Sequence, residues 1–67
     1  MQINKKILFS LMAQKGMDGG MLAEKAGLQR NTISRIITGR TQKITPLTAG
    51  KLAAALGVDV LELGTII

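Results

Sequence analysis

Apolar residues recur at helical spacing in two short stretches between Gly16 and Arg40. The first stretch places three of them on one face, namely Leu22, Ala23 and Ala26. The second does the same with Ile33, Ile36 and Ile37. The stretches are separated by Gly27, Leu28 and Gln29, and glycine readily adopts the left-handed conformation in which one helix ends and another begins at a steep angle. The pattern therefore predicts a helix-turn-helix.

Three further helical segments surround this pair. The first runs from Ile3 to Lys15 and carries an apolar face of Leu8, Leu11 and Met12. Another opens at Thr45-Pro46, an N-cap hydroxyl followed by proline at the first helical position, and ends at Gly57. A short last helix begins at a sequence like a capping box, Asp59 to Glu62, and ends at Gly64. We therefore expect an all-α fold, a compact bundle of five helices.

The same pattern predicts which side chains form the core. The inner side of the Thr45–Gly57 helix should consist of Leu47, Ala49, Leu52, Ala53 and Leu56. The far end of the core should be closed by Val58, Leu61 and Leu63. Phe9 is the only aromatic residue and is expected to anchor the core. Because Ile7 and Phe9 flank the apolar face of the first helix on opposite sides, one of them should be exposed or contact a partner.

The helix before the corner begins with an unusual pair of glycines. Asp18 is expected to cap this helix, and Gly19 and Gly20 follow it directly. Each glycine in a helix costs on the order of 1 kcal/mol relative to alanine. The alternative is that the glycines let backbone N–H groups approach a phosphate. We favour a weak or late start of the helix over a dedicated phosphate contact.

Composition excludes several classes of function. A chain of 67 residues is long enough for one domain, and it contains neither cysteine nor histidine. Disulfides, zinc fingers, cysteine nucleophiles and the commonest general base are therefore absent. The four carboxylates have capping or helix-surface positions, which argues against an enzyme, and no cofactor or metal is expected. Polar residues interrupt the apolar N-terminal segment, so no membrane span is expected and the protein should be cytoplasmic.

Positive charge is concentrated on and after the second helix of the corner. Nine Lys and Arg residues against four Asp and Glu residues give a formal charge of +5, and no acid lies between Glu24 and Asp59. The helix after the corner should run from about Gln29 to Thr38, with Gly39 in the left-handed conformation. Its outward face carries Arg30, Asn31, Ser34, Arg35 and Thr38. Such a face suits a polyanion, although a solvated basic surface would look the same by composition.

Four stretches of this sequence form a recognisable set. They are LAEKAG (Leu22 to Gly27), TISRI (Thr32 to Ile36), the pair Gly39-Arg40, and LAAALGV (Leu52 to Val58) followed by a short closing helix. In this order and spacing they resemble the Cro and phage-repressor type helix-turn-helix family of bacterial and phage transcription regulators. The resemblance covers nearly the whole chain and implies a lambda-repressor-like fold.

The resemblance also implies a set of DNA contacts. The helix after the corner would lie in the major groove, and the residues expected to read bases are Arg30, Asn31, Thr32, Ser34 and Arg35. Phosphate contacts would come from Thr38, Arg40, Gln42, Lys43 and Thr45. The implied partner is double-stranded DNA with a palindromic operator, bound by a homodimer that represses transcription, in the cytoplasm of a bacterium or from a phage. The alternative is a protein-interaction module, such as an antitoxin, that docks through Ile7, Phe9, Ile66 and Ile67.

Two positions depart from the pattern of the family. Many members carry Gln or Ser where this chain has Gly19, and that side chain touches phosphate, so this contact should be missing here. Many also pair an arginine late in the first helix with a glutamate near the end of the recognition helix, where this chain has Met12 and Ile37. Replacing both partners of an ion pair by apolar residues is often neutral or stabilising. We therefore predict that Met12 and Ile37 touch in the core.

Overall fold

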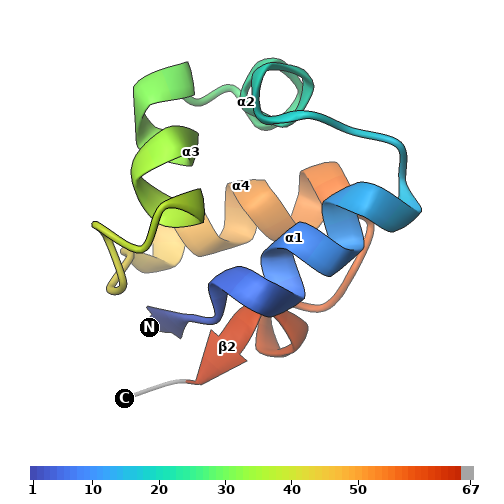
Figure 1. Ribbon diagram of the computed structural model, residues 1–67. Coiled ribbons are helices and arrows are strands. Elements are labelled where there is room, and N and C mark those ends of the chain that lie inside the picture. The colour runs from blue at the N-terminus through green and yellow to red at the C-terminus, as the bar shows by residue number, and fades with distance from the viewer. Residues whose placement is uncertain (66–67) are drawn as a thin grey trace.

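The structure, a computed structural model, describes residues 1–65, and four α-helices make up most of this part of the chain. They are α1 (Lys5–Gln14), α2 (Gly19–Ala26), α3 (Arg30–Ile37) and α4 (Pro46–Leu56). In Figure 1, α2 and α3 meet at a sharp corner above α1 and α4. Gly27 has φ +70° at this corner, and the N–H of Leu28 donates to the carbonyl of Ala23 at 2.8 Å. The predicted helix-turn-helix is therefore present, with α2 and α3 as its two helices.

The prediction of five helices is wrong, because the last predicted helix is a single 3-10 turn, η1 (Val60–Leu63). Its capping box does form: the Asp59 carboxylate accepts from the N–H of Leu61 at 2.9 Å, and the Glu62 carboxylate accepts from the N–H of Asp59 at 3.2 Å. The turn cannot extend, however, because the chain at Gly64 continues as a strand, β2 (Gly64–Thr65). A longer helix would need Gly64 and Thr65, and these residues are instead part of the paired strand.

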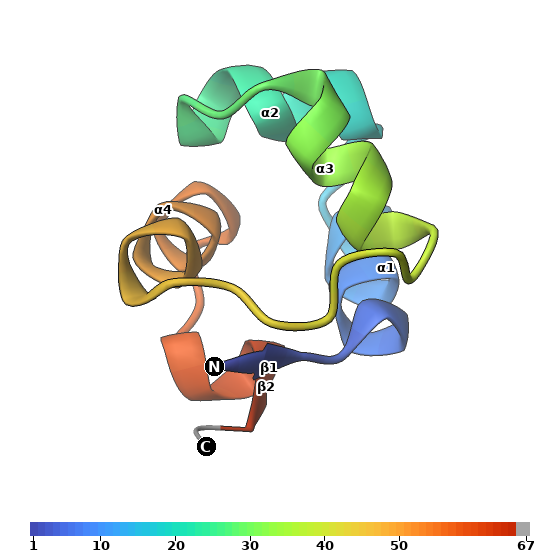
Figure 2. The same ribbon diagram turned by 90° about the vertical axis from the view of Figure 1, so that its left-hand side faces the viewer.

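The two ends of the described chain meet in a small sheet that the apolar pattern did not predict. Strand β1 (Gln2–Ile3) pairs antiparallel with β2, with Gln2 opposite Thr65 and Ile3 opposite Gly64. The first helix accordingly starts at Lys5 rather than Ile3, and the Asn4 side chain caps it by accepting from the N–H groups of Lys6 and Ile7. Figure 2 shows β1 beside β2, so that segments near the start and near the end of the described residues lie side by side.

The other edge of β1 holds the loop between α3 and α4. The N–H of Ile3 donates to the carbonyl of Gln42 at 2.8 Å, and the N–H of Ile44 donates to the carbonyl of Met1 at 2.9 Å. In Figure 2 this loop runs directly above β1. Strand β1 therefore lies between the loop and β2 and joins both to the body of the protein.

The core contains most of the predicted side chains. Those that are fully buried are Leu8, Leu22, Ile33, Ile36, Leu52, Leu56 and Leu63. Burying one such side chain contributes about 1.5–3 kcal/mol, so this set supplies the main driving force for folding. Met12 is buried and Ile37 is partly buried against the same core, so neither side chain of the predicted apolar pair points into solvent.

Three predicted core residues are instead exposed: Phe9 by 63%, Leu47 by 70% and Leu61 by 60%. Ile7 is exposed as well, by 40%, so both flanks of the α1 stripe face outward rather than one. The reason is that each short helix is covered along a narrow stripe, which in α1 consists of Leu8 and Met12 one turn apart. Residues about 100° away around the helix on either side of Leu8 fall outside that stripe.

The expected late start of α2 is also wrong, since α2 begins at Gly19 directly after its cap. The Asp18 carboxylate accepts from the N–H of Met21 at 2.8 Å, and the Asp18 carbonyl accepts from the N–H of Leu22 at 3.0 Å. The side-chain cap, worth about 1 kcal/mol in comparable helices, offsets part of the weak helix propensity of the two glycines.

Candidate nucleic-acid interface

Helix α3 presents a polar face to solvent. Its buried side chains are Ile33 and Ile36, which leaves Arg30, Asn31, Ser34 and Arg35 exposed and Thr32 half-buried. The five residues predicted to read bases therefore lie on one helix, four of them exposed. No carboxylate lies on this helix or on the loop that follows it, so the cations and amide of this face can approach phosphates without repulsion.

The loop after α3 holds the predicted phosphate-binding residues close to the end of that helix. Gly39 turns the chain with φ +81°, and the N–H of Thr41 then donates to the carbonyl of Arg35 at 3.0 Å. Arg40, Gln42 and Lys43 are exposed along this loop. Because the loop is also hydrogen-bonded to β1, its backbone is held at both ends, which reduces the ordering cost of binding through it.

Two of the predicted phosphate-binding hydroxyls are already occupied. Thr38 Oγ1 donates to the carbonyl of Ser34 at 2.8 Å. Thr45 Oγ1 donates to Thr48 Oγ1 at 3.1 Å while accepting from the N–H of Thr48 at 3.3 Å. A hydroxyl has a single hydrogen to donate, so Thr38, which donates to a carbonyl, cannot donate to a phosphate without giving up that bond. The hydroxyls of Thr45 and Thr48 can exchange donor and acceptor roles, so the hydrogen of Thr45 can become free for a phosphate.

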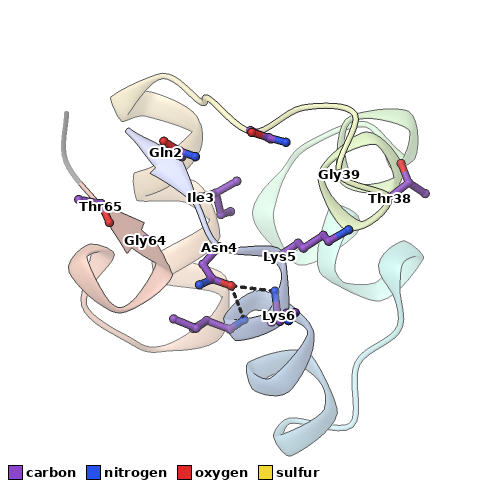
Figure 3. Close-up of a pocket in the computed structure, with 11 residues that line it drawn as sticks. Gln2, Ile3, Asn4, Lys5, Lys6, Thr38, Gly39, Gly64 and Thr65 are labelled. Atoms are coloured by element: carbon purple, nitrogen blue, oxygen red, sulfur yellow. Dashed lines mark hydrogen bonds between the residues drawn. The ribbon is translucent and has the colours of Figure 1, made fainter.

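A basic surface that the sequence pattern did not predict adjoins this loop. An open hollow lies between the first turn of α1 and the end of α3, and its lining includes Lys5, Lys6, Thr38, Gly39 and Gln42. In Figure 3 the Lys5 side chain extends from α1 toward Gly39. The Lys5 Nζ atom lies 3.0 Å from the position that a Cβ on Gly39 would take. Two more cations therefore continue the positive surface beyond the helix-turn-helix.

The sequence offered one signal for this surface, the pair Lys5-Lys6 in a helix without acidic residues. What the pattern could not show is that α1 begins beside the end of α3. That placement depends on β1, which fixes the start of α1 next to the loop.

The two glycines of α2 face different neighbours. A Cβ at Gly19 would meet Ile33 Cγ2 at 3.5 Å and Ile37 Cδ1 at 3.6 Å, on the side that packs against α3. A Cβ at Gly20 would meet the guanidinium of Arg30. A side chain at Gly19 would thus point toward apolar residues, whereas Gly20 borders the first residue of the recognition helix.

Within residues 1–65 no three acidic side chains come together in a way that could hold a metal ion. No helix in this part of the chain is long and apolar enough to cross a bilayer. Helix α3 and the loop after it provide exposed hydrogen-bond donors and cations, the chemistry needed to bind a polyanion.

Comparison with known families agrees with this geometry. A helix-turn-helix family model of the Cro/C1 type matches residues 8–63, and the chain belongs to this family of DNA-binding regulatory domains. The match spans all four α-helices except the first residues of α1. Neither the curated proteins nor the solved structures contain a match to the chain. The protein is therefore a DNA-binding transcription regulator in the general sense of its family.

Proposed function

We propose that the protein binds double-stranded DNA with sequence specificity and represses transcription, with α3 in the major groove. The observation that carries this proposal is the exposed, acid-free face of α3, formed by Arg30, Asn31, Ser34 and Arg35. A polar helix face in a small protein commonly mixes acidic and basic residues, whereas this one carries donors and cations alone. It is also the second helix of the motif, the one that enters the groove in this class of domain.

The residue types on α3 match the edges of bases. Arg30 and Arg35 can each donate a two-pronged pair of hydrogen bonds to O6 and N7 of guanine, and Asn31 can pair with N6 and N7 of adenine. Ser34 can contact any base, and the half-buried Thr32 can offer its methyl group to thymine. Each two-pronged contact discriminates against the wrong base by about 1–3 kcal/mol.

Anchoring on the DNA backbone comes mainly from the loop after α3. We assign phosphate contacts to Arg40, Gln42 and Lys43, which are exposed there, and to Lys5 at the edge of the adjoining hollow. Thr38 contributes less, because its hydroxyl hydrogen is used within the protein, whereas Thr45 can exchange roles with the Thr48 hydroxyl and donate to a phosphate. Phosphate contacts of this kind orient the domain without reading sequence.

The bound form in this proposal is a homodimer on a palindromic operator, in the cytoplasm of a bacterium or of a cell that carries the phage. One short recognition helix covers only a few base pairs, so specificity is gained by pairing half-sites about one helical turn apart. The exposed apolar side chains Phe9 and Leu61 lie on α1 and η1, two elements in contact with each other, and they offer surface for a second copy.

A second candidate is a protein-interaction module, such as an antitoxin that docks on another protein. The exposure of Ile7 and Phe9 favours it, because large apolar side chains on the surface of a small domain suit a protein interface. Ile66 and Ile67, the other predicted docking residues, lie outside the described residues. The two roles are compatible, since the apolar residues and the α3 face are separate.

Selection of binding sites from random duplex DNA by the purified protein tests the leading proposal. We expect one enriched sequence with two-fold symmetry and half-sites about one helical turn apart. Arg35→Ala and Asn31→Ala should each weaken binding to that sequence and relax preference at one position, whereas Lys51→Ala, on the exposed side of α4, should not. If neither α3 variant changes affinity or preference, α3 is not the reading element. Light scattering on the same sample distinguishes a dimer from a monomer.

A further inference from the structure

We propose that Gly20 determines DNA specificity through Arg30: the absence of a side chain at Gly20 lets the Arg30 guanidinium lie flat on the first turn of α2. This inference rests on the proposed function, since it assigns Arg30 a fixed position from which to contact DNA. In this view Gly20 is a positioning residue, and Arg30 makes the contact.

The distances define how the guanidinium lies. A Cβ on Gly20 would be 3.2 Å from each of three Arg30 atoms, Cζ, Nε and Nη2. These atoms belong to one planar group whose bonds are less than half that length. A point that is equally far from all three must therefore stand above the plane of the group rather than beside it. The guanidinium thus presents its flat side to Gly20.

That contact is available only to glycine. Carbon atoms in contact normally lie 3.5–4.0 Å apart, so a methyl group at position 20 would push the guanidinium outward by a few tenths of an ångström. Arg30 is exposed, so its guanidinium can shift toward solvent without disturbing the core. A methyl group at position 20 would therefore alter the position of the guanidinium and leave the fold unchanged.

The flat contact leaves the N–H donors of the Arg30 guanidinium free. The N–H groups of a guanidinium point outward in its plane. A neighbour that covers one flat side therefore leaves these N–H groups accessible to a ligand at the edge of the group. A side chain held in this way loses less freedom when it binds than one that is loose in solvent. Arg30 is the first residue of α3 and lies against the beginning of α2, so its donors are held where both helices of the motif start.

The chain supplies matched controls for this idea. Gly19 is in the same turn of α2, but a Cβ there would make ordinary contacts, 3.5 Å to Ile33 and 3.6 Å to Ile37. Gly50 is inside α4, and a Cβ there would meet nothing within 4 Å. Alanine at each of the three glycines adds the same methyl group to a helix, but at Gly20 alone does it meet Arg30.

The test is a double-mutant cycle on the duplex that the wild-type protein selects. Arg30→Ala should weaken binding by about 5- to 150-fold, the range for loss of one two-pronged contact. Gly20→Ala should give a several-fold loss in the presence of Arg30 and no further loss in the Arg30→Ala background. Gly19→Ala and Gly50→Ala should bind like the wild type. Equal effects of Gly20→Ala in both backgrounds, or no effect in either, would overturn the inference while the proposed function stands.

A second measurement separates positioning from folding. In the DNA-free protein, NMR should show a nuclear Overhauser contact between Arg30 Hε and the Gly20 α-hydrogens, and the Arg30 Nε–Hε resonance should shift in Gly20→Ala but not in Gly50→Ala. The melting temperature of Gly20→Ala should equal or exceed that of the wild type, because alanine favours the helix. Absence of the contact would overturn the inference. A wild-type protein that selects no duplex would overturn the proposed function, and this inference with it.

Discussion

Lys5 and Gly39 meet across the boundary between α1 and the end of α3, with Lys5 Nζ 3.0 Å from the position of a Cβ on Gly39. The carbonyl end of a helix carries partial negative charge, so a lysine is stabilised at this place. The same lysine lies beside the loop that carries Arg40, Gln42 and Lys43. A residue outside the helix-turn-helix is thereby added to its basic surface.

Lys5→Gln should weaken DNA binding equally for preferred and non-preferred sequences. If Lys5 neutralises one phosphate, its loss should reduce the slope of log affinity against log salt by about 1. Lys51→Gln removes the same charge from the exposed side of α4 and should leave the slope unchanged. Titrations of duplex DNA by fluorescence anisotropy at several salt concentrations measure both. An unchanged slope for Lys5→Gln would show that Lys5 does not contact a phosphate.

Gly64→Ala should destabilise the sheet that joins the two ends of the described chain. A Cβ on Gly64 would overlap the carbonyl oxygen of Gln2 and lie 2.9 Å from Ile3 Cα, both of them backbone atoms that cannot turn aside. Moving β1 away should lower the free energy of unfolding by about 1–3 kcal/mol. Gly50→Ala, which adds a methyl group in open space, should instead raise it by up to about 1 kcal/mol. Urea denaturation gives both values, and equal effects would contradict the close approach.

Asn4→Ala should weaken the start of α1. The Asn4 side-chain oxygen accepts from the N–H groups of Lys6 at 3.0 Å and Ile7 at 3.2 Å, and loss of such a cap costs about 1 kcal/mol. Asn4→Ser retains an acceptor and should recover most of that stability. Gln14→Ala removes an exposed side-chain bond at the other end of α1 and should have little effect. Thermal unfolding measures the stability of the three variants. An Asn4→Ala variant as stable as the wild type would show that the cap contributes nothing.

Phe9→Ser should change the stability of the monomer by no more than about 0.5 kcal/mol, because 63% of Phe9 is exposed. Leu8→Ala, the adjacent substitution, should cost about 2–5 kcal/mol, because Leu8 is fully buried. Chemical denaturation at low protein concentration measures the difference. A large loss in Phe9→Ser that grows with protein concentration would instead place Phe9 in a contact between copies.

The sequence predicted the parts of the fold that depend on local chemistry. The corner at Gly27, the caps at Asp18 and Thr45 and the ends at Gly39 and Gly57 all occur where the residue types indicated. Each of these features needs only a few neighbouring residues, so it can be recognised from a short stretch of chain.

The parts that failed depend on what lies beside an element in space. A strand of two residues is too short to show the alternation of apolar and polar residues by which strands are recognised. Strand β1 exists because the loop and β2 lie on either side of it. Likewise, periodicity places Phe9 and Leu61 near an apolar face but cannot say how wide a stripe the neighbouring elements cover. The contacts of Lys5 with Gly39 and of Arg30 with Gly20 also join residues from different elements.

The position of β1 also sets the order in which the chain can fold. The partners of β1 and of the residues on either side of it, which are Gln42, Ile44, Leu63 and Thr65, all follow it by a long stretch of sequence. Helices α2, α3 and α4 pack through contacts between closer parts of the chain, which form early, whereas joining distant ends carries the larger entropic cost and comes late. During synthesis on the ribosome, β1 can therefore pair with β2 only after Thr65 has emerged, whereas its partners around Gln42 are available earlier. Slow hydrogen exchange at the Ile44 amide, which donates to Met1, and at the Asn4 amide, which donates to Leu63, would report the two sides of this pairing separately.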